Sequence, residues 1–315
     1  MREVKIKANE AGQRLDKWLS KYMNQAPKSF FYKMLRKKNI TLNGKKADGS
    51  ERLAEGDEIK LFLSEETLEK FSKSDMIYVK PKLSIIYEDE HILILNKPAG
   101  MLSQKAEPQD ISLNEHLLSY LMKTGQCTKE SLRHIRPSVC NRLDRNTSGL
   151  IVAGKTIPGL QVMAAALKDR SLHKFYHCIT AGELSESSRL EGYLIKDKQT
   201  NQVMITRQET PQAAYIQTEY RPLLYTNDWT RLEVKLITGR SHQIRAHLAS
   251  VGHPIIGDCK YGDGGINQIY RKKYKITHQL LHSARMEFPQ IKGELSYLSG
   301  KVFEAPEPKE FQYFT

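Results

Sequence analysis

The stretch Asn141-Arg142-Leu143-Asp144-Arg145-Asn146-Thr147-Ser148-Gly149-Leu150 is a short polar segment that runs into the apolar residues Ile151-Val152-Ala153. This composition predicts a loop that enters a buried strand. It places one carboxylate, Asp144, between two arginines, so we expect Asp144 to be ionised and fixed in direction. A nucleophilic or proton-abstracting carboxylate needs both properties. The structural alternative is a turn that Asp144 caps itself, with solvated arginines beside it.

Arg-Leu-Asp, with Thr-Ser-Gly two residues later, resembles the catalytic motif of the large RNA pseudouridine synthases, the family of the RluA, RluC and RluD enzymes. The resemblance covers nearly the whole chain and is closest to the RluC type. It implies isomerisation of uridine to pseudouridine in structured RNA by Asp144, without cofactor or metal. The family usually has His before this motif, whereas this chain has Asn141, which cannot titrate near neutral pH.

Charge and composition favour a polyanionic partner. The chain has 315 residues, a net charge of +13 and a pI near 9.4. RNA fits better than a membrane, because the sequence has no long apolar span and no basic amphipathic helix. Its start does not resemble a signal peptide, and its four cysteines lack CxxC pairing. We therefore expect a monomer in the reducing cytoplasm, with ribosomal RNA preferred as substrate and transfer RNA as the alternative.

Residues 1–64 predict a small module of two helices and a hairpin sheet. Apolar residues follow a helical period from Leu15 to Met23, and a second helix is expected after Ser29, which would cap it. Asn43-Gly44 is a hairpin turn signal. The following residues, 65–84, are polar and mixed in charge, which predicts a linker before a catalytic domain over 85–315.

This front module carries a run of basic residues. No acidic residue stands between Asp16 and Asp48, and the candidate RNA-binding residues there are Lys33, Arg36, Lys37 and Lys38. A charge run is often only a solvated face. Here it lies in a context that resembles the S4-like RNA-binding domain, and this implies phosphate contacts that give affinity without sequence readout.

In the catalytic domain, the segment Lys174-Phe175-Tyr176-His177-Cys178-Ile179 alternates like a strand. The family has a Lys-x-Tyr strand here, which implies that Tyr176 faces the uracil, where it would stack or pass a proton. The simpler interpretation is a core tyrosine. Lys174 shares the face of Tyr176 and is a candidate for phosphate contact. Lys97, in a Lys-Pro turn, resembles the family's first motif and is also taken as RNA-binding.

A later block, Thr238-Gly239-Arg240-Ser241-His242-Gln243-Ile244-Arg245, predicts a helix capped by Ser241. The resemblance implies that Arg245 pairs with Asp144, and we expect a bidentate fork that Lys could not supply. Arg240 and His242 are candidate RNA-binding residues, as is Arg142.

The late histidines, with Asp258 and Cys259 as further ligands, offer a zinc site as an alternative. His242 and His247 are five residues apart, so they diverge on a helix and no metal is expected. Residues 261–275, rich in glycine and then lysine, predict a loop whose basic and tyrosine side chains could bind RNA, or simply a mobile surface loop.

Together these patterns predict an α+β protein. The small S4-like α/β module would precede a pseudouridine-synthase-like domain built on a mixed, largely antiparallel sheet with flanking helices. Two rivals remain open. The first is an RNA-binding ribosome-assembly factor that has lost catalysis, for which Asn141 in place of the usual His is the hint. The second is a basic hydrolase, which would release free uracil or cleave RNA strands.

Deleting residues 1–64 should weaken RNA binding and flatten its dependence on salt, because phosphate contacts release counterions. The test measures the dissociation constant for RNA over a range of salt concentrations. Unchanged affinity would refute the interpretation of the front module.

Overall fold

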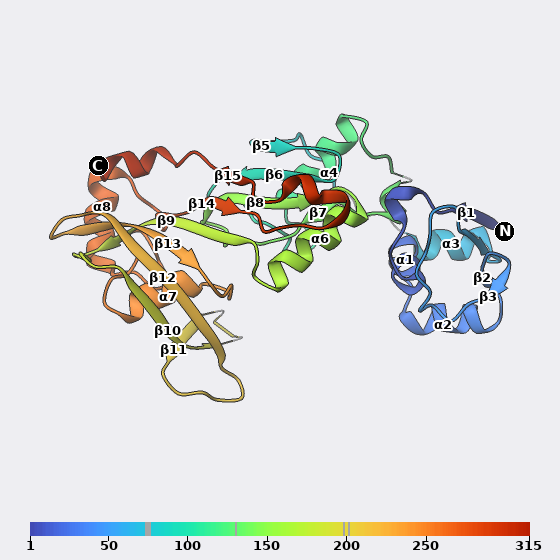
Figure 1. Cartoon of the computed structure of the whole chain (residues 1–315), viewed down its shortest axis with the longest axis horizontal. Coiled ribbons are helices and arrows are strands. Elements are labelled where there is room, and N and C mark those ends of the chain that lie inside the picture. Colours follow the sequence, from blue (N-terminus) through green and yellow to red (C-terminus); the bar gives the residue numbers. More distant parts are fainter. Residues whose placement is uncertain (73–76, 130, 198, 201) are drawn as a thin grey trace.

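The computed structural model describes residues 1–72, 77–129, 131–197, 199–200 and 202–315. Two bodies follow one another along the chain: the front module lies at one end, and the C-terminus lies at the other end of the larger body (Figure 1). The amide of Gln161 in the larger body reaches the carbonyl of Gly12 in the front module at 3.4 Å.

The front module packs three helices on a four-stranded sheet of order β1-β4-β2-β3. Its elements are β1 (Arg2–Lys5), η1 (Ala8–Glu10), α1 (Leu15–Tyr22), α2 (Lys28–Arg36), β2 (Ile40–Leu42), β3 (Lys45–Lys46), β4 (Glu58–Leu61) and α3 (Glu65–Phe71). The predicted stripe of α1 is buried, and Trp18 stacks on Tyr22 with ring centroids 4.8 Å apart. Asn43 and Gly44 both have positive φ, as the hairpin turn requires.

Two local predictions in this module are wrong. Helix α2 begins at Lys28 after Pro27, so Ser29 lies inside it and does not cap it. Part of the expected linker is helix α3, which Ser64 caps and whose Leu68 is buried in the module's core. The front module therefore extends to Phe71, and a clean deletion would remove residues 1–72. Residues 73–76 of the expected linker lie outside the described residues.

The larger body is built on a sheet whose strands run in the order β11-β10-β12-β13-β9-β14-β8-β6-β5. The strands are β5 (Ile85–Glu88), β6 (Ile92–Lys97), β7 (Ser138–Val139), β8 (Ser148–Gly154), β9 (His173–Ala181), β10 (Ser188–Lys196), β11 (Val203–Thr206), β12 (Ala214–Tyr225), β13 (Trp229–Leu236), β14 (Leu281–Glu287) and β15 (Val302–Glu304). Among the described residues, every pair of neighbouring strands is antiparallel except β14 with β8. The predicted α+β class with a mixed, largely antiparallel sheet is confirmed.

Both faces of this sheet are covered by separate hydrophobic clusters. Along β8, Ile151 and Ala153 join one cluster, whereas Leu150 and Val152 join the other. The first cluster also holds residues of α4 (Leu113–Lys123) and α7 (Gln243–Ser250), and the second holds residues of α6 (Ile157–Lys168) and η2 (Gly293–Leu298). This two-sided burial explains why β8 reads as a continuous apolar run.

The segment predicted as a basic loop is largely helical. Helix α8 (Gly264–Tyr274) begins at an Asp263 cap and ends in a basic turn, which suits the helix dipole. The rings of Tyr270 and Tyr274 pack against Phe314, and RNA binding by this segment stays a prediction. The short α5 (Ser131–His134) and η3 (Lys309–Tyr313) complete the helices. In the described ranges, no helix combines the length and apolarity that a membrane span needs.

Gly149 is required where β8 leaves the polar loop. Its φ is +108°, and a Cβ there would lie 2.3 Å from the carbonyl oxygen of Ser283. We expect Gly149→Ala to lower the free energy of unfolding by more than about 4 kcal/mol. Gly125 also has positive φ but no atom near its Cβ position, so Gly125→Ala should cost about 1–2 kcal/mol. Urea unfolding measures both, and equal losses would contradict the steric argument.

Candidate active site

The loop from Asn141 to Ser148 is held by hydrogen bonds at alternate residues. The Asn141 side-chain oxygen accepts from the backbone N–H of Val152 at 2.8 Å. Ser103 bonds both backbone groups of Leu143, accepting from its N–H at 3.0 Å and donating to its carbonyl at 2.8 Å. Arg142 and Asp144 lie between these anchored residues, and this whole stretch of the loop lines a cavity.

Lys97 holds the middle of the same loop. Its ammonium group donates to the carbonyls of Pro98, Met101 and Arg145 at 3.0, 2.8 and 3.0 Å, and its side chain is fully buried. Burial lowers the pKa of Lys97, whereas the nearby charge of Asp144 and the three carbonyl acceptors favour the ammonium form. Since all three donors are occupied by backbone oxygens, the prediction that Lys97 binds RNA is wrong. It fixes the loop instead.

The guanidinium group of Arg245 donates hydrogen bonds to two carboxylates. Its Nε and Nη2 donate to Asp258 at 2.6 and 2.8 Å, while Nη1 donates to Asp144 at 2.7 Å. The expected pairing of Arg245 with Asp144 is present, but the bidentate fork is made with Asp258. Arg142 and Arg145 are exposed, and neither forms an ion pair with Asp144 among the described residues.

Burial makes this arrangement electrostatically strong. Burial alone would raise the pKa of Asp258, but hydrogen bonds and charge from Arg245 hold it below its usual value. Burial likewise disfavours charged Arg245, and the two carboxylates still raise its pKa overall. Asp258 is also held by the backbone N–H groups of Lys260 and Tyr261 at 2.8 and 3.1 Å. Asp144 keeps a side-chain exposure of 25%, so it faces the cavity while tied to a fixed cation.

His242 completes the wall beside Asp144. It has a left-handed backbone (φ 56°) at the start of α7, so Ser241 does not cap this helix as predicted. Its Nδ1 lies 2.8 Å from the hydroxyl of Tyr261, and its Nε2 lies 3.9 Å from Asp144 Oδ1. Burial lowers the pKa of His242, although the charge of Asp144 opposes this, so the imidazole is neutral near pH 7.

Tyr176 and Lys174 enter the cavity from β9. They share one face of the strand, as the alternation predicted, and both line the cavity. Tyr176 is only 5% exposed, and burial raises the pKa of its phenol, so the phenol is protonated. Burial lowers the pKa of Lys174, and repulsion from Arg170 adds to this effect.

One cavity of about 930 Å³ collects most of the predicted site residues. Those that line it are Asp144, Tyr176, Arg245, Arg142, Lys174, Arg240 and His242. The exposed residues Lys33, Arg36, Lys37 and Lys38 belong to the front module and do not line it. The structure therefore separates a cleft from a second basic surface.

Sequence reasoning missed the residues that support this cleft. The sequence suggests only a possible metal-ligand role for Asp258, and it does not distinguish Ser103 or Tyr261 as supporting residues. Nothing local marks them, because each acts on a residue distant in the chain. Within the residues that the structure describes, no three His, Cys, Asp or Glu side chains are grouped so as to hold a metal ion.

Comparison with known proteins gives matches over both bodies. The profile described as RNA pseudouridylate synthase matches residues 91–250, and that described as S4 domain matches residues 13–59. Ribosomal large subunit pseudouridine synthase C of Vibrio vulnificus is 29% identical over 90% of this chain and 87% of its own. Ribosomal large subunit pseudouridine synthase D of Borreliella burgdorferi is 30% identical over 99% of this chain and 91% of its own.

Solved structures share the fold of the larger body. Human RNA Pseudouridylate Synthase Domain Containing 4 superposes with a TM-score of 0.57 and 20% identity, over 73% of this chain and 90% of that one.

Lys97→Met should leave RNA affinity and its salt dependence unchanged, because Lys97 contacts only protein carbonyls. Losing these bonds should lower stability by about 1–3 kcal/mol and slow pseudouridine formation. Lys37→Met provides the contrast: if exposed Lys37 binds a phosphate as predicted, its loss should flatten the slope of log K against log salt by about 0.7–0.9. A similar flattening in Lys97→Met would show that Lys97 does bind phosphate.

Proposed function

Because this chain belongs to the RNA pseudouridylate synthase family, we propose that it converts uridine to pseudouridine in large-subunit ribosomal RNA with Asp144 as the catalytic carboxylate. The chain is an RNA pseudouridine synthase by membership and fold. The choice of ribosomal RNA is supported by the names of the relatives. The observation that carries the role of Asp144 is its 2.7 Å contact with buried Arg245 inside the cavity.

The cavity carries an excess of positive charge that suits an RNA backbone. Several cationic side chains line the cavity without forming an ion pair with another described residue. They are Arg142, Arg145, Lys168, Arg170, Lys174 and Arg240. Lys174 is desolvated and repelled by Arg170, so it gains most from an incoming anion. These groups would hold the phosphates on either side of a uridine that has left its stack.

Asp144 would act on the ribose of that uridine. It would either attack C1′ or remove a ribose proton, and the detached uracil would turn and rejoin through C5. Both routes need an ionised carboxylate aimed at the sugar. The guanidinium of Arg245 supplies the counter-charge and direction.

Tyr176 would pack against the uracil. Its ring belongs to the hydrophobic cluster beneath the cavity, and its phenol is protonated because its pKa is raised. A protonated phenol is a poor base at neutral pH, which favours the stacking role over removal of the C5 proton. Stacking on an aromatic ring is a common way to hold an unstacked base.

The front module would supply affinity. It contains the S4 domain match and exposes Lys33, Arg36, Lys37 and Lys38 on and just after α2. Contacts from these side chains to phosphates would position the RNA without reading its sequence. We further propose that the protein acts as a monomer in the cytoplasm, where its free cysteines would stay reduced.

The presence of Asn141 is no argument that the protein is an inactive ribosome-assembly factor. Its side chain accepts a backbone hydrogen bond from Val152, so the position serves the geometry of the loop. The hydrolase alternative differs in its products, since it would release free uracil or cleave the strand.

Asp144→Asn should bind RNA nearly as tightly as the native chain and form no pseudouridine, because the amide keeps the shape and loses the charge. Asp197→Asn is the matched control, since Asp197 is an exposed carboxylate that does not line the cavity. Both variants are incubated with ribosomal RNA, and pseudouridine is mapped. Substantial turnover by Asp144→Asn would overturn the assignment. Maps from cells with and without the protein would then identify the uridine.

A further inference from the structure

The end of the catalytic loop rests on a buried histidine. Ser148 is paired with His282 where β8 runs parallel to β14, and the Ser148 hydroxyl lies 2.8 Å from His282 Nδ1. The other ring nitrogen, Nε2, lies 3.3 Å from the carbonyl oxygen of Ala305. His282 has no exposed surface. It therefore joins the loop to the C-terminal segment through the interior of the protein.

The partners of His282 fix the position of its proton. The carbonyl of Ala305 can only accept, so Nε2 carries the hydrogen, and Nδ1 then accepts from the hydroxyl of Ser148. Burial lowers the pKa of His282 to about 4, and the ring is neutral at physiological pH. Two directed hydrogen bonds thus run from Ser148 to His282 and from His282 to Ala305.

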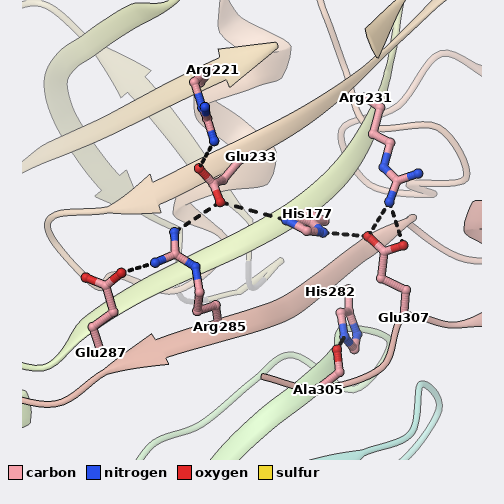
Figure 2. A network of polar contacts seen from close by, with 9 residues as sticks. All are labelled: His177, Arg221, Arg231, Glu233, His282, Arg285, Glu287, Ala305 and Glu307. Atoms are coloured by element: carbon pink, nitrogen blue, oxygen red, sulfur yellow. Dashed lines mark hydrogen bonds and ion pairs between the residues drawn. The ribbon is translucent and has the colours of Figure 1, made fainter. Parts of the chain in front are cut away.

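The C-terminal segment is a firm support for this chain of bonds. The N–H of Ala305 donates to the carbonyl of Ala284 at 2.8 Å, and β15 pairs with β14 just before it. Two residues later, Glu307 accepts from Arg231 at 2.6 and 2.8 Å and lies 2.5 Å from His177 Nδ1 (Figure 2). The segment is therefore tied to three strands of the sheet.

Fixing Ser148 fixes the turn that presents Asp144. The N–H of Thr147 donates to the carbonyl of Asp144 at 3.1 Å, and the Thr147 hydroxyl accepts from Gln279 at 3.3 Å. Next along the chain, Gly149 lies against the backbone of Ser283 as closely as glycine allows. A displacement of Ser148 would therefore be transmitted to Asp144.

We propose that His282 is a positioning residue for catalysis. Its ring, anchored on the carbonyl of Ala305, accepts a hydrogen bond from the Ser148 hydroxyl and thereby holds Asp144 in position. This inference rests on the proposed role of Asp144. A catalytic group displaced by about 1 Å can lose about a hundredfold in rate. Ser148 belongs to the loop that carries Asp144, so we expect the bond from His282 to Ser148 to matter more for turnover than the bond to Ala305.

Two substitutions separate the two bonds. In His282→Asn the amide oxygen lies near the place of Nδ1 and can still accept from Ser148. In His282→Gln the amide nitrogen lies near the place of Nε2 and can still donate to Ala305. We expect His282→Asn to keep kcat within about threefold and His282→Gln to lose about tenfold to a hundredfold, with KM for RNA unchanged in both.

Ser148→Ala tests the same bond from the other side with a small change. It should match His282→Gln, and the double variant should be no slower than either single variant, because all three remove one interaction. The matched control is His91→Gln. His91 is another buried histidine whose Nδ1 lies 2.9 Å from a hydroxyl, that of Thr156, and it does not line the cavity. This control should lower Tm and leave kcat unchanged.

Amide hydrogen exchange of the peptide 141–149 provides a readout that does not need turnover. Exchange should be faster in His282→Gln and Ser148→Ala and native-like in His282→Asn. Equal kcat in the Asn and Gln variants, or losses that multiply in the double variant, would overturn the inference. If the native chain forms no pseudouridine in ribosomal RNA, the proposed substrate fails, and the exchange measurements still decide the role of His282.

Discussion

The arrangement of the cleft depends on the way in which Arg245 is shared. Asp258 takes two of its nitrogens in a fork, and backbone N–H groups of the following turn hold Asp258 in place. These contacts fix the guanidinium plane without any contribution from Asp144, and the remaining Nη1 faces the loop. A planar cation with divergent donors can bridge two carboxylates in this way, whereas an ammonium group is a point charge. The direction of Asp144 is thus set through Arg245 by the buried side chain of Asp258, more than a hundred residues away.

The loop itself is constructed to match this fixed cation. Hydrogen bonds tie its odd-numbered residues from Asn141 to Thr147 to neighbouring segments, and the loop as a whole lines the cavity. This anchoring and the contact with Arg245 hold Asp144 in place although its side chain is partly exposed. The anchoring also explains why a charged residue, Lys97, is buried: three carbonyls of sharply turning backbone need donors, and one ammonium group supplies all of them.

The sequence predicts what depends on local pattern and leaves out what depends on tertiary partners. The helical stripe at Trp18, the hairpin turn at Asn43 and the alternation around Tyr176 were readable, because period and turn chemistry are local. Helix α3 was missed, since its seven residues bury only Leu68 and show no stripe. Helix α8 was read as a loop because it opens with two glycines. The fork to Asp258 has no local signature, and for the same reason Lys97 was given the wrong role.

Asn141 shows why a departure from a family pattern need not change the chemistry. The position supplies a hydrogen-bond acceptor to the N–H of Val152 at the point where the chain doubles back on β8. An imidazole nitrogen can accept from the same N–H, so His and Asn satisfy one requirement with different side chains. The carboxylate of Asp144, the cation of Arg245 and the ring of Tyr176 line the same cavity as Asn141. Asn141 therefore keeps the anchor that positions the loop of Asp144, although the residue differs from the family pattern.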